Sequence, residues 1–164
     1  MLDSLKKFFS ELAVKPANRF DENDYRLAAA ALLIHVMSVD GAASDAERDV
    51  LRTVLKSQFE LDDAALDELI EAATEADREA IDLYHFTSVI MRSVNEEGRL
   101  RIIEMMWELV YADGQVSEFE DNVVWRAADL LGVSSRDRID LKHRVAEKQA
   151  GLPKGPWGIA DAAM

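Results

Sequence analysis

Apolar residues recur at intervals of three and four positions along most of the chain, which is the spacing of one face of an α-helix. No segment shows the sustained alternation of apolar and polar residues that is typical of a half-buried strand. We therefore predict an all-α protein, a compact bundle of about seven to eight helices. The periodic segments place these helices at about 21–39, capped by Asp21, and at about 45–58, 62–75, 79–93, 96–112, 118–131 and 135–147.

The two ends of the chain differ from this predicted core. Residues 1–20 place apolar side chains on one helical face before Pro16, so we predict an N-terminal amphipathic helix and a linker. Docking on the protein body is favoured over a role at a membrane surface or on a partner. Residues 148–164 hold two of the three prolines, which predicts a Pro/Gly-containing tail after one helical domain at 21–147. The apolar face of the N-terminal helix comprises Leu2, Leu5, Phe8, Phe9 and Leu12.

Charge and composition narrow the classes of function. The formal net charge of -13 repels nucleic-acid phosphates and attracts cations or basic partners, so we expect no nucleic-acid partner. The absence of cysteine excludes disulfides, thiolate metal sites and cysteine nucleophiles. Residues 1–20 are too densely charged for a signal peptide, and the longest apolar run, 27–37, is too short to span a bilayer. We expect a cytoplasmic protein with no membrane span.

A short motif occurs twice in the chain. Residues 34–51 align without gaps on residues 107–124, and the aligned segments share an Asp-Gly-x-x-Ser-x-x-Glu pattern with apolar residues at matching positions around it. This predicts an internal duplication of a helix–corner–helix unit. The identical pairs are Asp40 and Asp113, Gly41 and Gly114, Ser44 and Ser117, and Glu47 and Glu120.

The motif overlaps the second half of an EF-hand calcium loop, but the first half is missing. With Gly114 at the sixth loop position, the first and third ligand positions are Leu109 and Tyr111. In the first copy they are Val36 and Ser38, so neither copy supplies the ligands that an EF-hand needs. We therefore reject an EF-hand at both corners.

Helix capping explains most of the motif without a ligand. Gly41 and Gly114 suit the left-handed residue that follows a helix, and each Ser with the Glu three positions later forms a predicted capping box. The aspartates are not explained in this way, because Asp40 and Asp113 fall at a helix C-terminus, where negative charge is disfavoured. They either accept hydrogen bonds within the corner or bind a divalent cation, Ca²⁺, Mg²⁺ or Mn²⁺, together with Glu47 and Glu120.

Three further residues are secondary candidates for a site. His35 lies five residues before Asp40, and a half-buried histidine with a protein partner is favoured there over a metal ligand. Glu104 and Glu108 are neighbours one turn apart in a predicted helix, so they need a nearby basic residue or an ion. The sequence contains no phosphate-binding glycine loop and no nucleophile motif, and a metal-assisted hydrolase that uses the corner carboxylates is the weakest alternative.

The duplicated segments VDGAASDAE and ADGQVSEFE, in an acidic helical chain, resemble the TerB-like tellurite-resistance family. The resemblance covers about residues 24–146, including AADLLGVSS at 127–135. It implies a compact helical domain without enzymatic activity, a role in resistance to tellurite and other stresses, and metal binding by acidic residues. By motif position those residues are Asp40, Glu47, Asp113 and Glu120.

The leading functional prediction is therefore a non-enzymatic stress-response module that binds a protein partner not identified by the sequence, with a divalent cation at the corners. The alternative is a purely structural interaction domain whose corners are hydrogen-bonded without metal.

Overall fold

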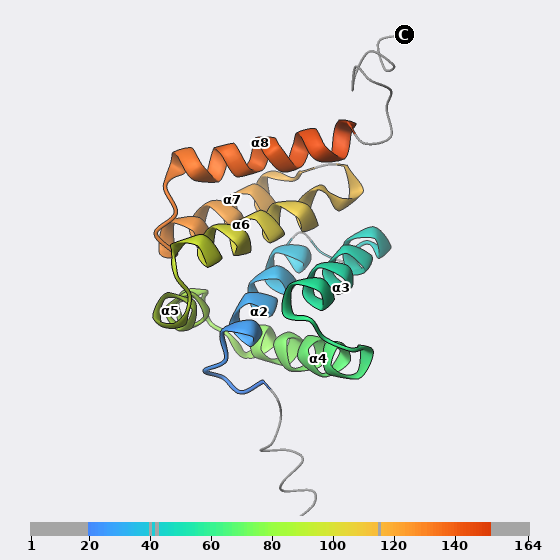
Figure 1. Cartoon of the computed structure of the whole chain (residues 1–164), viewed down its shortest axis with the longest axis vertical. Coiled ribbons are helices and arrows are strands. Elements are labelled where there is room, and N and C mark those ends of the chain that lie inside the picture. The colour runs from blue at the N-terminus through green and yellow to red at the C-terminus, as the bar shows by residue number, and fades with distance from the viewer. Residues whose placement is uncertain (1–19, 40, 42, 115, 152–164) are drawn as a thin grey trace, which may run out of the picture.

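The computed structural model describes residues 20–39, 41, 43–114 and 116–151. This part contains seven α-helices, one short 3₁₀ turn and no strand, which confirms the predicted all-α class (Figure 1). The predicted N-terminal helix and the tail from residue 152 lie outside the described residues. The elements are α2 (Tyr25–Ser38), α3 (Asp45–Phe59), α4 (Asp63–Glu79), α5 (Tyr84–Ser93), α6 (Glu96–Val110), η1 (Tyr111–Asp113), α7 (Glu118–Leu130) and α8 (Ser135–Gly151).

Helix α2 begins later than its predicted cap at Asp21. The Asp24 carboxylate accepts a 2.9 Å hydrogen bond from the Arg26 backbone N–H and caps the helix, whereas Asp21 accepts one from the Asn23 N–H in the preceding turn. The Arg26 side chain also bonds Asp24, which raises the pKa of the guanidinium, and lies 4.6 Å from the ring centroid of Phe20. Phe20 is thereby held in a buried position just before α2.

The boundary between α4 and α5 was predicted wrongly. Helix α4 continues to Glu79 rather than 75, and α5 begins at Tyr84 rather than 79. Ala80 has extended backbone angles (φ -74°, ψ 140°), so residues 80–83 form a non-helical connection. Apolar spacing continues through residues 79–83, which is why the pattern placed the break at 76–78 instead.

Helix α2 is the centre of the core. Ala29, Ala30, Ala31 and Leu32 are each 0% exposed, and α2 contacts α4, α5, α6, α3 and α7. Small alanine side chains allow these neighbours to approach closely, and Figure 1 shows α2 between α4 and α6. The helix is therefore apolar around most of its circumference, as a fully buried helix must be.

Helix α6 forms the second buried element. Ile103, Met106 and Trp107 are each 0% exposed, and burial of such side chains stabilises a fold by roughly 1.5–3 kcal/mol each. The Trp107 indole N–H donates a 3.2 Å hydrogen bond to the carbonyl of Arg138 in α8, and the Lys142 amine lies 5.2 Å from the same ring system. Helix α8 covers α6 through these contacts and continues four residues beyond its predicted end at 147.

The two helix–corner–helix units pack against each other. Helix α2 contacts α6 and α7, and α3 contacts α6 and η1, so each unit supplies part of the other's core. In the described part of the chain, no helix combines the length and the apolar character needed to cross a bilayer.

Candidate functional site

Both corners contain a complete capping box. At the first corner, the Ser44 hydroxyl accepts a 3.1 Å hydrogen bond from the Glu47 N–H, and Glu47 Oε1 accepts a 2.8 Å bond from the Ser44 N–H. At the second corner, the corresponding distances between Ser117 and Glu120 are both 3.0 Å. The repeated sequence thus has the same local geometry in both copies.

Glycine allows the chain to turn before each capping box. Gly41 has φ +123° and Gly114 has φ +85°, backbone conformations that residues with a side chain rarely adopt. The Gly114 N–H donates a 2.9 Å bond to the Tyr111 carbonyl and closes the 3₁₀ turn η1. The second corner therefore passes from α6 through η1 to α7 without an intervening long loop.

The corner glutamates are buried. Glu47 is 4% exposed and Glu120 is 3% exposed. Among the described residues, these are the buried charged side chains. A carboxylate removed from water in this way is costly unless hydrogen bonds satisfy it. The backbone N–H of the capping serine supplies one such bond in each corner.

The structure describes only one of the two aspartates of the motif. Asp113 is exposed and belongs to η1, because α6 ends at Val110 instead of running to 112 as predicted. Asp40 lies outside the described residues. Within the described ranges, no group of three or more His, Asp or Glu side chains could hold a metal ion. Three of the four predicted ligands, Glu47, Asp113 and Glu120, thus form no such group without Asp40, and the four-residue ligand set stays a prediction.

The secondary candidates have protein partners. Arg101 Nη1 lies 2.8 Å from a Glu104 oxygen and 3.4 Å from Glu108, so one guanidinium lies between the two like charges. Arg101 Nε also donates to the Gln58 side chain at 2.9 Å and links α6 to α3. His35 Nδ1 lies 2.8 Å from Asp77 Oδ1, which joins α2 to α4.

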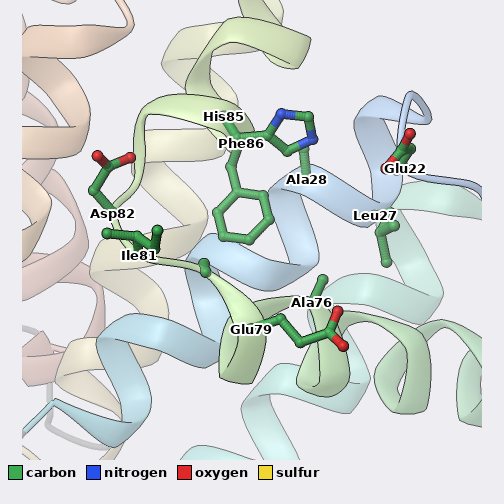
Figure 2. A pocket seen from close by; sticks show the side chains of 10 residues that line it. Glu22, Leu27, Ala28, Ala76, Glu79, Ile81, Asp82, His85 and Phe86 are labelled. Carbon is green, nitrogen blue, oxygen red and sulfur yellow. The ribbon is translucent and has the colours of Figure 1, made fainter.

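A separate hollow lies between α2, α4 and the start of α5, and we call it the α4–α5 groove. Its volume is about 520 Å³, and Glu22, Glu79 and Asp82 form its acidic rim. Figure 2 shows these carboxylates spread around the hollow, with the Phe86 ring between them. Ile81, which also lines the groove, is 100% exposed. The apolar floor comprises Leu27, Ala28, Ala76 and Phe86.

Sequence reasoning missed the groove because it placed the break between α4 and α5 at 76–78 rather than at 80–83. A continuous helix through residues 79–83 would leave no recess there. The only local signal is the acidic run at 60–79, a pattern that is typical of a solvated helix face.

Comparison with known proteins gives one match. The family model described as "Tellurite resistance protein TerB" matches residues 26–143. The match spans both corners, runs from the second residue of α2 into α8, and leaves residues 1–25 and 144–164 outside. No curated protein matches the chain, and no solved structure does.

Proposed function

Because the chain belongs to the TerB tellurite-resistance family, we propose that it is a non-enzymatic stress-response module that binds a protein partner and holds a divalent cation at its corners. The cation is Ca²⁺, Mg²⁺ or Mn²⁺, since these hard ions prefer carboxylate oxygens. The ligands are Asp40, Glu47, Asp113 and Glu120. The observation that carries the proposal is the buried, hydrogen-bonded glutamate that occurs once in each Asp-Gly corner.

The capping geometry supports cation binding by fixing the glutamates in advance. Each capping bond is made by Oε1, so the conformations of Glu47 and Glu120 are determined before any ion arrives. An ionised carboxylate has about four lone-pair sites, so one capping bond does not exhaust its capacity. Pre-ordered ligands lose little conformational entropy on binding, and the net charge of -13 raises the local concentration of cations.

The same geometry favours one alternative. Each capping box gives its serine and glutamate two reciprocal hydrogen bonds that need no metal ion. A purely structural interaction domain, in which the corners never bind metal, is therefore the second candidate.

Calorimetry and thermal unfolding of the full chain with Ca²⁺, Mg²⁺ or Mn²⁺ separate the two candidates. A cation that binds only the folded state stabilises it, by about 2.7 kcal/mol when its concentration is 100 times its Kd. We expect a rise in Tm with millimolar cation for the wild type. The absence of any response in the wild type would refute the cation part of the proposal.

Variants at the corners locate the ion. The Asp40→Asn/Asp113→Asn variant should lose the rise in Tm. The Glu47→Gln/Glu120→Gln variant should also lose it while retaining its capping bonds, because glutamine fills the same position in capping boxes. The matched control removes charge at the same corners outside the ligand set: Asp45→Asn/Glu118→Gln, which alters exposed first-turn residues, should respond like the wild type.

The stress-response role is tested by survival on tellurite. Cells that lack the gene should lose resistance, and the wild-type gene should restore it. Unchanged survival without the gene would argue against this role, whatever the result with cations.

A further inference from the structure

We propose that the α4–α5 groove is a docking site for the chain's own N-terminal segment, residues 2–15. This inference goes beyond the proposed function and does not depend on cation binding. It rests on the shape and charge of the groove, on the point at which the described chain begins, and on the pattern of residues 2–15.

The groove offers an apolar surface that lacks a cover within the described part of the chain. Ile81, which lines the groove, is fully exposed. The volume of about 520 Å³ falls in the range of sites that bind several apolar groups. Burial of apolar surface is favourable at roughly 25 cal/mol per Å², so an apolar helix face laid on Ile81 and the groove floor would stabilise the fold.

The N-terminal segment has the matching pattern. Its apolar residues fall on one helical face, which includes Phe8 and Phe9, and Lys6 and Lys7 lie outside it. An amphipathic helix buries its apolar face against another surface or leaves it in water. The groove floor provides such a surface, and it lies within the same chain.

The charges are complementary. The groove rim carries Glu22, Glu79 and Asp82. Residues 1–19 carry four basic side chains against two acidic ones, in a chain that is otherwise strongly acidic. Opposite potentials on two surfaces favour their association and fix its orientation. The basic residues are Lys6, Lys7, Lys15 and Arg19.

The connection between segment and groove is short. Glu22 lines the groove and lies two residues after the start of the described chain at Phe20, which lines a separate hollow on α4. Pro16 ends the predicted helix, and four residues of linker, 16–19, extend at most about 14 Å. The segment is therefore tethered near the groove at a high effective concentration.

The test uses a nitroxide spin label on the full chain. Because the chain has no cysteine, Ser10→Cys gives a single labelling position, and residue 10 lies off the apolar face of the predicted helix. We expect paramagnetic broadening of the backbone amide signals of Ala76, Ile81 and Phe86. His143 belongs to α8, which Figure 1 shows on the opposite side of α6 from α4, and its amide should keep its linewidth.

Variants on either surface should remove the effect. Glu79→Lys/Asp82→Lys reverses two rim charges, and Phe8→Ser/Phe9→Ser removes both aromatic side chains from the apolar face. Both should return the groove amides to the linewidths of the chain with a reduced, diamagnetic label. The matched control Asp140→Lys/Glu147→Lys makes the same charge change on exposed positions of α8 and should preserve the broadening.

Three outcomes would overturn the proposal. The first is groove amides that are no broader than His143. The second is seen when an isotope-labelled chain without nitroxide is mixed with an unenriched chain that carries the nitroxide. Broadening of the groove amides in that mixture would assign the groove to a second copy of the chain. The third is loss of the broadening on addition of vesicles containing phosphatidylserine, which would assign the segment to a lipid surface. The cation experiments above are unaffected by any of these results, so the two proposals fail separately.

Discussion

Replacement of a capping serine provides a direct measure of what one corner contributes to stability. Ser117→Ala deletes the hydroxyl that accepts the 3.0 Å bond from the Glu120 N–H. The reciprocal bond, from the Ser117 N–H to Glu120 Oε1, uses backbone and is kept. The loss is therefore limited to one hydrogen bond and one N–H that becomes unsatisfied beside a side chain only 3% exposed.

The expected loss of stability follows from the loss of this one capping hydrogen bond. Loss of a serine cap costs about 1 kcal/mol, within a range of roughly 0.5–2 kcal/mol. For a domain of this size, 1 kcal/mol lowers Tm by about 2–4 °C. Ser44→Ala should give the same result at the first corner, because its bond from the Glu47 N–H has nearly the same length, 3.1 Å.

Urea unfolding followed by circular dichroism measures the change, with the m-value checked for constancy. Ser117→Asn should recover most of the loss, since asparagine caps helices about as well as serine. Ser93→Ala, at an exposed position in the last turn of α5, is the matched control and should change stability little. Equal losses for Ser117→Ala and Ser93→Ala, or no recovery with asparagine, would refute the capping argument.

Three other perturbations follow from single contacts. Gly114→Ala should lower the free energy of unfolding by about 1–2 kcal/mol in urea titrations, because φ is +85° there, and the absence of a measurable loss would contradict the strain argument. Trp107→Phe should lower it by about 1–3 kcal/mol, because the Arg138 carbonyl loses its indole donor, and no loss would show that water replaces the bond. The hydrogen bond from Lys56 lowers the pKa of Asp63, so Lys56→Met should raise that pKa toward its ordinary value in an NMR titration. Since the folded pKa is the lower one, the pair's small contribution to stability is present above the ordinary aspartate pKa and is lost as pH falls through the folded value.

The features that sequence predicts well are those set by neighbours three or four residues apart. Helix periodicity and the Ser-x-x-Glu boxes are of this kind, and both are found in the structure. The partners of His35 and Arg101 are of the other kind, because Asp77 and Gln58 lie 42 and 43 residues away in the chain. Only the packing of α2 on α4 and of α6 on α3 brings them together, and no local pattern encodes that packing.

The misplaced helix boundaries have a related cause. Residues 76–83 keep apolar spacing and contain no proline or glycine, so nothing local signals that Ala80 is extended. Tertiary packing of Phe86 and Leu83 into the core determines where α5 starts, since both are at most 5% exposed. The α4–α5 groove depends on this break and was therefore beyond the reach of sequence patterns.

The reciprocal bonds at the corners also bear on how quickly the protein folds. Each capping box joins residues three apart, so it closes with almost no loop entropy and can form before distant contacts exist. Helices α3 and α7 thus have defined starting points while the chain is still open. We expect the slow part of assembly to be the docking of the two helical pairs, α2–α3 on α6–α7, because their contacts join segments that are distant in the sequence. Changes in the capping serines should therefore slow folding, whereas changes in the α2–α6 contact should speed unfolding if that contact forms late.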